Sequence, residues 1–366
     1  MTKVRRRRQL VCRWMPEGLE VGVPGRQQWV RLSPELVTVM ERAGAGIEVD
    51  DLASGFGVEH EGAVRAAIDG LTLVGVLESP DGVREDPPLW GRWGGIAERF
   101  HTEARDADYL VDGPERAEEA GAIVAQGGAP DSFKQYPDRP VVLLPRQPLA
   151  LNASVGWVFA GRRTHRRFTA DPVSLDQLGT LLFHSFAPHR FTDAGVFGVQ
   201  QCRVSASAGA RHEVEAYVVV YQVTGVVPGL YHYSAARHAL ELLDDDVPRE
   251  RVAELSYGQE ASFQGAFTVL TTAVANRLAW KYRHPRAYRL WMYDAGHYGQ
   301  TFALAATALG LGPFQTVAFQ DSAVEDLLGV DPDEEFAVYL LAAGVPDAPT
   351  ALLPGDFAFP PPSTVH

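Results

Sequence analysis

The chain has 366 residues, a formal net charge of −13, 46% hydrophobic residues and 22% charged residues. These values are typical of a soluble globular protein with more than one core, and the acidic excess disfavours a nucleic-acid partner. The only cysteines are Cys12 and Cys202, which excludes a disulfide scaffold and a zinc cluster, and no apolar run reaches 18 residues, so we expect a cytoplasmic protein without a membrane span.

Residues 1–82 are expected to form a small winged-helix-like domain. Its basic run at residues 5–8 is short, and we interpret it as a solvated edge. A hairpin is predicted over residues 19–32, followed by a helix that begins at Pro34 after the capping residue Ser33. Two further helices are predicted at residues 49–54 and 61–71, followed by a short wing strand at residues 75–77.

The second and third predicted helices carry the wrong charge for DNA. Their acidic residues, against the single basic residue Arg65, are Glu48, Asp50, Asp51, Glu59, Glu61 and Asp69. DNA recognition requires the opposite sign. A domain of this kind can instead accept a peptide strand along a sheet edge, as a leader-peptide clamp, or it can be purely architectural. Both roles stay open at this point.

Residues 83–150 are rich in proline, glycine and charge, and we expect an irregular connecting segment. A connection of this length is usually either functional or wrapped on a neighbouring domain. Its aromatic residues, among them Trp90, Phe133 and Tyr136, favour wrapping over disorder.

Residues 151–350 are expected to form one α+β domain, followed by a C-terminal tail at residues 351–366. Strands are predicted at residues 218–223, 229–233, 239–243, 267–274 and 337–342. The longest predicted helix covers residues 285–309, and Gly310 stands where a left-handed C-cap belongs.

An arginine-rich segment is the first candidate binding element. Arg162, Arg163, Thr164 and Arg166 lie within five positions, and Arg167 follows. Arginine offers forked, permanently charged donors and threonine adds a hydroxyl, a combination that suits a phosphate. A basic helix start on the surface would give the same pattern.

Two segments of small residues are the next candidates. Ser207 and Gly209 lie in a run of Ser, Ala and Gly that would let a flat ligand approach the backbone, although an ordinary loop has the same composition. Gly310 and Gly312 follow the long helix and could present backbone N–H groups, or simply end the helix. They are no dinucleotide fingerprint, because there the glycines precede the helix.

Lys281 and Tyr282 are adjacent at a predicted strand-to-helix junction. A tyrosine beside a cation can serve as a proton acceptor, because the positive charge lowers its pKa. An amphipathic junction with exposed charges is the simpler explanation of this pair alone.

Together and in this order, the motifs between Pro87 and Pro346 resemble the SagB-type dehydrogenases, the azoline-oxidising branch of the FMN-dependent nitroreductase superfamily. The motifs are Arg-Arg-Ser-x-Arg at residues 162–166, Ser-Ala-Gly-Ala at 207–210, Pro-Gly-Leu-Tyr-x-Tyr at 228–233, Ala-Gly-His-x-x-Gln at 295–300 and Gly-Leu-Gly at 310–312. Thr164 replaces the usual serine and keeps its hydroxyl, and His212-Glu213 stands where a Pro-Glu pair is common.

The resemblance implies a nitroreductase-like fold with a central, mostly antiparallel sheet flanked by helices, a homodimer and bound FMN. It assigns the phosphate, ribityl and pyrimidine edge of FMN to Arg162, Arg163, Thr164 and Arg166. It places Ser207 and Gly209 against the flavin from the partner subunit, and the backbone of Gly310 and Gly312 beside the ring. Lys281 and Tyr282 match the catalytic pair of azoline dehydrogenases.

The activity implied is oxidation of thiazoline or oxazoline rings in a ribosomally made peptide to thiazoles or oxazoles. An azoline-containing precursor peptide would be the substrate and a cyclodehydratase a partner enzyme. The alternatives are an NAD(P)H-dependent nitro or quinone reductase and a non-catalytic scaffold of a peptide-modifying complex. The enzyme hypothesis requires the four candidate segments to meet around one planar flavin.

Overall fold

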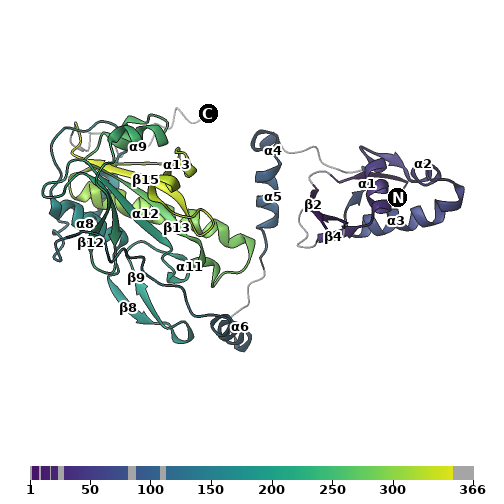
Figure 1. Ribbon diagram of the computed structural model, residues 1–366, viewed down its shortest axis with the longest axis horizontal. Coiled ribbons are helices and arrows are strands. Elements are labelled where there is room, and N and C mark those ends of the chain that lie inside the picture. The colour runs from purple at the N-terminus through teal and green to yellow at the C-terminus, as the bar shows by residue number, and fades with distance from the viewer. Residues whose placement is uncertain are drawn as a thin grey trace, which may run out of the picture. The chain divides into compact units, whose positions relative to one another are not determined.

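The computed structural model describes residues 2–7, 10–16, 18–23, 29–80, 88–107 and 113–348. The chain divides into two compact units, residues 1–108 with 284–286 and residues 109–283 with 287–366 (Figure 1). The expected tail at residues 351–366 lies outside the described residues. Among the described residues, no helix combines the length and apolar character that crossing a membrane requires.

The N-terminal unit contains two small sheets and a group of helices. Its strands are β1 (Lys3–Arg6), β2 (Val11–Met15), β3 (Gly18–Gly22), β4 (Trp29–Leu32), β5 (Ile47–Glu48) and β6 (Leu77–Glu78). Its helices are α1 (Pro34–Ala43), α2 (Val49–Ser54), α3 (Glu61–Leu73), α4 (Pro88–Trp93) and α5 (Gly95–Glu103). One sheet has the order β2-β3-β4 and the other β5-β1-β6. The predicted cap of α1 is confirmed, because the Ser33 hydroxyl accepts a hydrogen bond from the Leu36 N–H.

The predicted wing and the basic run have a different role from the one expected. β6 pairs with β1, so that Arg5 lies opposite Glu78. The Arg5 Nη2 and Arg7 Nε atoms lie 2.8 and 3.0 Å from the Glu78 carboxylate. Arg5 and Arg7 are therefore ion-paired, whereas Arg6 is exposed and Arg8 lies outside the described residues. Pairing between residues more than 70 positions apart leaves no local pattern from which to predict it.

Residues 83–150 are more ordered than the composition suggested. Besides α4 and α5, they contain helix α6 (Pro114–Ala125) and strand β7 (Val141–Leu143). Between α6 and β7 the chain lies on the core of the second unit, where the Tyr136 N–H donates to Glu241. Residues 88–107 belong to the first unit and residues 113–150 to the second, and both stretches contain regular elements. Wrapping of this segment on a neighbouring domain stays a prediction.

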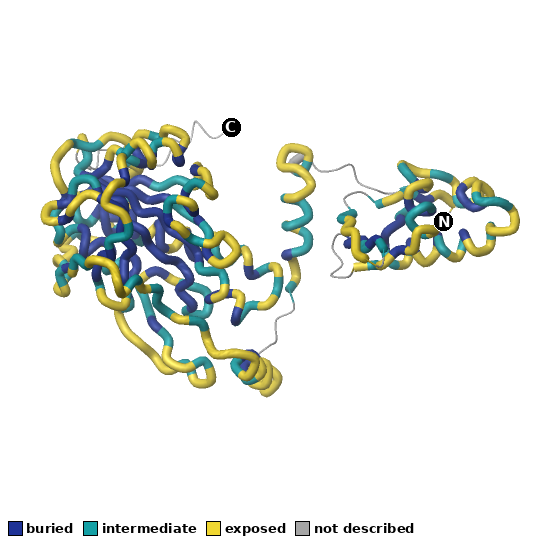
Figure 2. The backbone as a smooth tube through the Cα atoms, in the orientation of Figure 1, coloured by how far each residue is buried: buried dark blue, intermediate teal, exposed yellow. Residues whose placement is uncertain are grey.

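The second unit is built on a seven-stranded sheet with the order β14-β15-β13-β10-β11-β12-β7. Its further strands are β10 (Val214–Val220), β11 (Gly229–Ser234), β12 (Ala239–Asp244), β13 (Phe267–Val274), β14 (Gly312–Thr316) and β15 (Glu335–Gly344). Every neighbouring pair is antiparallel. The central strands are buried throughout (Figure 2).

Helices cover both faces of this sheet. They are α7 (Val155–Gly161), α8 (Leu175–Phe186), α9 (Arg249–Leu255), α10 (Glu260–Phe263), α11 (Ala275–Ala279), α12 (Tyr288–Ala308) and α13 (Asp321–Leu328). Side chains alternate along β10: Val218 packs with residues of α8 and α12 on one face, and Tyr217 with residues of α9 and α13 on the other. A sheet buried on both faces explains the run of apolar and aromatic residues at 216–220 of β10. The predicted α+β class with a central antiparallel sheet is confirmed.

Strands β8 (Arg190–Asp193) and β9 (Val199–Cys202) form a separate hairpin that projects from this body (Figure 1). The 3₁₀ turn Gly195–Phe197 connects the two strands.

Candidate active site

The arginine-rich segment and the post-helix glycines lie against each other. α7 ends at Gly161, and the chain then passes β14, where the His165 N–H donates to the Pro313 carbonyl at 2.9 Å. A Cβ added to Gly312 would lie 2.8 Å from the His165 ring, so a side chain at position 312 would displace this turn. Gly310 is exposed and has a φ of 75°, which favours glycine. We call this cluster, Arg162–Arg166 in sequence with Gly310 and Gly312, the arginine half-site.

The arginine half-site offers cationic donors at the protein surface. Arg162 and Arg166 have no carboxylate within 4 Å in the part of the chain that the structure describes, and the Thr164 side chain is exposed. The Arg163 guanidinium donates to the carbonyls of Ala160 and Arg162, at the C-terminus of α7. Arg162, Thr164 and Arg166 are therefore the donors available for an anionic ligand.

Gly209 lies against the lysine–tyrosine pair, and Ser207 stands two positions before it in the same loop. α11 leads into the pair, because the N–H groups of Lys281 and Tyr282 both donate to the Leu278 carbonyl. A Cβ added to Gly209 would lie 2.6 Å from the Tyr282 hydroxyl oxygen and 2.8 Å from Lys281 Nζ. Gly209 also has a φ of 58°. Only glycine both adopts this φ readily and leaves room for the Tyr282 and Lys281 side chains. We call this cluster the lysine–tyrosine half-site.

The loop of the lysine–tyrosine half-site is strained and firmly held. Ala210 and His212 have φ values of 53° and 48°, a region that costs a non-glycine residue about 1–2 kcal/mol. The Ser207 hydroxyl accepts a hydrogen bond from the His212 N–H at 2.8 Å, and the Ala208 N–H donates to Asp294 of α12 at 2.8 Å. These bonds fix the backbone before any ligand arrives.

His212 is a neutral, buried side chain beneath this loop. Its Nε2 lies 3.0 Å from the Gln201 carbonyl, which can only accept, so Nε2 carries the proton. Its Nδ1 then accepts from the Tyr298 hydroxyl at 2.8 Å. Burial and the charge of Arg203 lower the pKa of His212 to about 3.

Glu213 and Asp294 form a buried carboxyl pair next to the loop. Glu213 is fully buried, and its Oε2 accepts from the Ser207 hydroxyl at 3.3 Å. Burial and the negative charge of Asp294 raise the pKa of Glu213 to about 8. Glu213 is therefore protonated at neutral pH.

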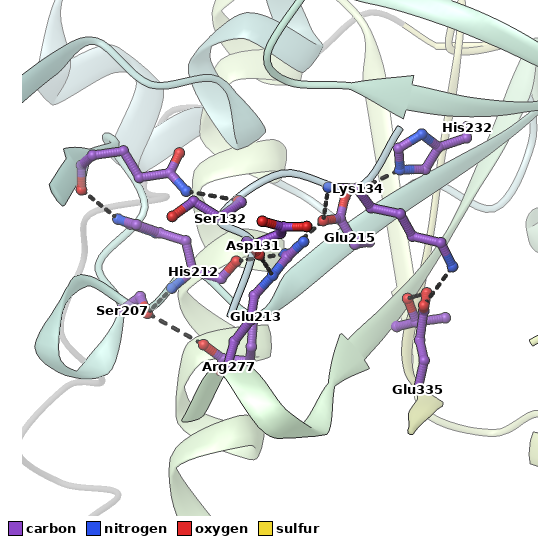
Figure 3. A network of polar contacts seen from close by, with 12 residues as sticks. Asp131, Ser132, Lys134, Ser207, His212, Glu213, Glu215, His232, Arg277 and Glu335 are labelled. Carbon is purple, nitrogen blue, oxygen red and sulfur yellow. Dashed lines mark hydrogen bonds and ion pairs between the residues drawn. The ribbon is translucent and has the colours of Figure 1, made fainter. Parts of the chain in front are cut away.

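A polar network lies behind the loop, inside the sheet (Figure 3). Arg277 Nη1 donates to Glu215 Oε1 at 2.5 Å and to the His212 carbonyl at 3.2 Å. His232 lies between two carboxylates, 3.1 Å from Glu215 and 3.0 Å from Glu241. Burial opposes ionisation of Glu215, but Arg277 and His232 outweigh it and lower its pKa to about 2.

Sequence reasoning missed Glu213, Asp294 and the network. The available signal was the pair Glu213 and Glu215 at the start of an apolar strand, where a carboxylate requires a buried partner. The partners Arg277 and Asp294 lie more than 60 positions away in the sequence, so no spacing rule identifies them.

The two half-sites lie far apart within one chain. The Ser207–Gly209 loop is hydrogen-bonded to Asp294 near the start of α12. Gly310 of the arginine half-site follows the other end of this helix, 16 positions after Asp294. At about 1.5 Å per residue, this separation is roughly 24 Å, more than a flavin ring system spans. A single chain therefore brings the four segments together in two pairs, and the expectation that all four meet is not met within one chain.

A large open cavity of about 900 Å³ lies elsewhere in the second unit. It is bounded by α12, α13 and the start of β15, with the aromatic side chains Tyr288, Trp291, Phe319, Phe336 and Tyr339 in its wall. None of the sequence-predicted site residues lines it.

Residues 159–345 match the nitroreductase family, and the chain belongs to this family. It is similar to the trifolitoxin-processing protein TfxB of Rhizobium leguminosarum bv. trifolii, with 28% identity over 294 residues that cover 75% of this chain and 78% of TfxB. It is also similar to MJ1384 of Methanocaldococcus jannaschii, which is described as a nitroreductase, with 29% identity over 51% of this chain and 88% of that protein.

Solved structures agree on the fold. A crystal structure from Anabaena variabilis, described as a nitroreductase, superposes with a TM-score of 0.53 at 21% identity. The match covers 73% of this chain and 50% of that one, so this chain spans half the length of that protein. The expected nitroreductase-like fold is thereby confirmed.

Proposed function

We propose that the protein is an FMN-dependent dehydrogenase that oxidises thiazoline or oxazoline rings of a ribosomally made peptide to thiazoles or oxazoles. The observation that carries the proposal is the position of Lys281 and Tyr282, whose polar atoms both lie against Gly209 on a nitroreductase fold. The similarity to a protein named for trifolitoxin processing supports a role in product modification.

The residues of the arginine half-site fit FMN. Arg162, Arg166 and Thr164 supply uncompensated donors for its phosphate and ribityl groups, and the backbone at Gly310 is exposed, whereas Gly312 is buried against the His165 ring. Arg163 would have to leave the α7 carbonyls to take part. When bound, FMN supplies a two-electron acceptor for a hydride.

The lysine–tyrosine half-site supplies the proton acceptor. Aromatisation of an azoline removes a hydride from Cβ and a proton from Cα, so one side chain must take the proton while the ring is held in place. Lys281 and Tyr282 offer two such atoms side by side, next to the Ser207–His212 loop, whose backbone is already fixed. General base catalysis of this kind contributes about 10²–10⁴ to the rate.

The active site would be completed by a second copy of the chain. The two half-sites are each open and about 24 Å apart in one chain, so a flavin that touches both needs two chains. The outward face of α12 supports such a contact: Tyr293, Gly296, Gln300 and Leu304 follow helical spacing and carry no charge. An apolar groove of about 340 Å³ runs beside it, with Val155, Phe159 and Leu304 in its wall.

The N-terminal unit would bind part of the precursor peptide. In the described residues, β2 and β4 are the outer strands of their sheet, and each leaves one edge for an added strand. Trp14 on β2 is 80% exposed. We expect Trp14→Ala to weaken peptide binding, measured by fluorescence anisotropy of a labelled precursor peptide, and an unchanged Kd would contradict this role. The azoline itself requires an earlier cyclodehydratase.

The direct test combines an absorbance spectrum with anaerobic mixing. The purified protein should show the yellow absorbance of oxidised flavin and lose it on addition of an azoline peptide. Lys281→Ala and Tyr282→Phe should retain FMN and bleach at least about 100-fold more slowly. Parent-like bleaching by both variants would refute their roles. Bleaching by NADPH but not by the peptide would show a nitro or quinone reductase instead.

A further inference from the structure

Arg211 is a buried cation that lacks an acidic partner. It directly follows the strained turn of the lysine–tyrosine half-site and is only 9% exposed. Its Nε has no hydrogen-bond partner, and no carboxylate of the described residues lies within 4 Å of its guanidinium. The Trp280 ring lies 5.2 Å from its guanidinium carbon. Buried arginines are normally paired, so this one requires an explanation.

The Lys281 amine, like Arg211, has positive charges near it and no acidic partner among the described residues. Its Nζ lies over the Phe197 ring at 4.6 Å and next to Gly209, and no carboxylate of the described chain comes within 4 Å. The charged groups that act on it are Arg211 from the loop and Arg116 from α6, and Tyr282 stands beside it. Both charges are positive.

The nearby acids do not offset this charge. Glu213 is protonated, for the reasons given above. Asp294 accepts from the Ala208 N–H and lies 3.8 Å from His297, while Glu215 is held by Arg277 and His232. The carboxylates on β10 and α12 are thus used within the structure, which leaves Arg211 and Lys281 as like charges in a half-buried pocket.

We propose that Arg211 is a positioning residue that acts through Lys281, keeping its amine uncharged and able to accept the azoline proton. This inference rests on the function proposed above. Two like charges in a pocket of reduced dielectric repel, and the flexible amine can release its proton whereas the guanidinium cannot. Burial, followed by the charges of Arg211 and Arg116, lowers the pKa of Lys281. The aromatic rings favour the charged amine, but this effect is smaller than the combined cost of burial and repulsion.

The sequence makes a direct measurement practicable, because the chain has only three lysines, Lys3, Lys134 and Lys281. Protein labelled with ¹³C at lysine Cε would give three resonances whose titrations can be followed separately. Lys134 is the internal control. Burial lowers the pKa of its amine, but the ion pair with Glu335 at 2.6 Å outweighs burial, so that the pKa of Lys134 is raised. Lys281→Arg assigns the signal.

We expect Arg211→Gln to move the Lys281 titration to higher pH and Arg116→Gln to move it less. Lys134 should titrate identically in all three proteins. The acid limb of the pH–rate profile for azoline oxidation should move upward by the same number of pH units, so that the rate below the limb falls tenfold per unit moved.

An unmoved Lys281 titration in Arg211→Gln overturns the inference, whatever the activity. A moved titration with an unmoved rate profile also overturns it, because Lys281 would then not be the proton acceptor that Arg211 controls. Failure of the proposed function gives a different result. The parent protein would then oxidise no azoline peptide, although the Lys281 titration still moves in Arg211→Gln.

Discussion

At Gly209 the backbone φ of 58° coincides with the close approach of two side-chain atoms from another segment. Gly209→Ala should therefore lower the free energy of unfolding by about 1–2 kcal/mol from backbone strain alone and reduce azoline oxidation, because Tyr282 and Lys281 must move. Gly121→Ala in α6 is the matched control: nothing lies within 4 Å of its added Cβ, and the change should stabilise by about 0.5–1 kcal/mol. Denaturant unfolding measures both, and a neutral Gly209→Ala would contradict the geometry.

Glu213 gives a pH dependence of opposite sign to the usual one for a carboxylate. Its folded pKa is raised from 4.5 to about 8, so the folded state holds a proton that the unfolded chain releases above pH 4.5. The free energy of unfolding therefore falls between about pH 4.5 and 8. Glu213→Gln mimics the protonated acid and should be more stable than the parent by on the order of 4–5 kcal/mol at pH 8.5, and equally stable at pH 4. A stability difference that does not change with pH would refute the raised pKa of Glu213.

The sequence identified individual site residues only where a motif contains them. Arg162, Gly209, Gly312 and Lys281 follow from motifs in their expected order, and the structure places them in two clusters. Arg211 could not be identified, because its significance lies in the absence of an acidic partner. That property depends on folding and leaves no trace in local spacing.

The helices and strands that were predicted correctly are those whose own residues favour the observed conformation. The strand over residues 267–274 agrees with β13, because its β-branched residues suit a buried strand. The long helix agrees with α12, and Gly310 adopts the left-handed conformation that ends it. β1 and α6 were missed, since a basic strand is stabilised by a distant Glu78 and a short helix by the core beneath it.

The network between β10, β11 and α11 should make the second unit acid-sensitive. Glu215 has a folded pKa of about 2 against 4.5 unfolded, so its stabilising effect is present above pH 4.5 and lost as the pH falls toward 2. Glu215→Gln should lower the free energy of unfolding by about 3 kcal/mol at pH 7 and by about 1 kcal/mol at pH 3. Glu254→Gln is the control, since its side chain is 71% exposed and should change little. An equal loss at both pH values would show that the pairing with Arg277 contributes no charge effect.

For the whole molecule, a flavin that contacts both half-sites, as proposed, requires a dimer. Leu304→Glu places a charge on the outward face of α12, so it should yield monomers that no longer retain FMN. Val58→Glu changes an equally apolar residue that is 83% exposed in the N-terminal unit, and it should leave the dimer intact. Light scattering coupled to size exclusion measures both. A parent protein that is itself monomeric while holding FMN would contradict the shared site.

The most direct measurement is complementation between two inactive variants. One chain carries Arg162→Ala and Arg166→Ala, and the other carries Lys281→Ala and Tyr282→Phe. If each active site combines the arginine half-site of one chain with the lysine–tyrosine half-site of its partner, every mixed dimer regains one intact site. An equimolar mixture after subunit exchange should then recover about a quarter of the parent rate of azoline oxidation. A mixture that stays inactive, although native mass spectrometry shows the mixed dimer, would contradict the shared site.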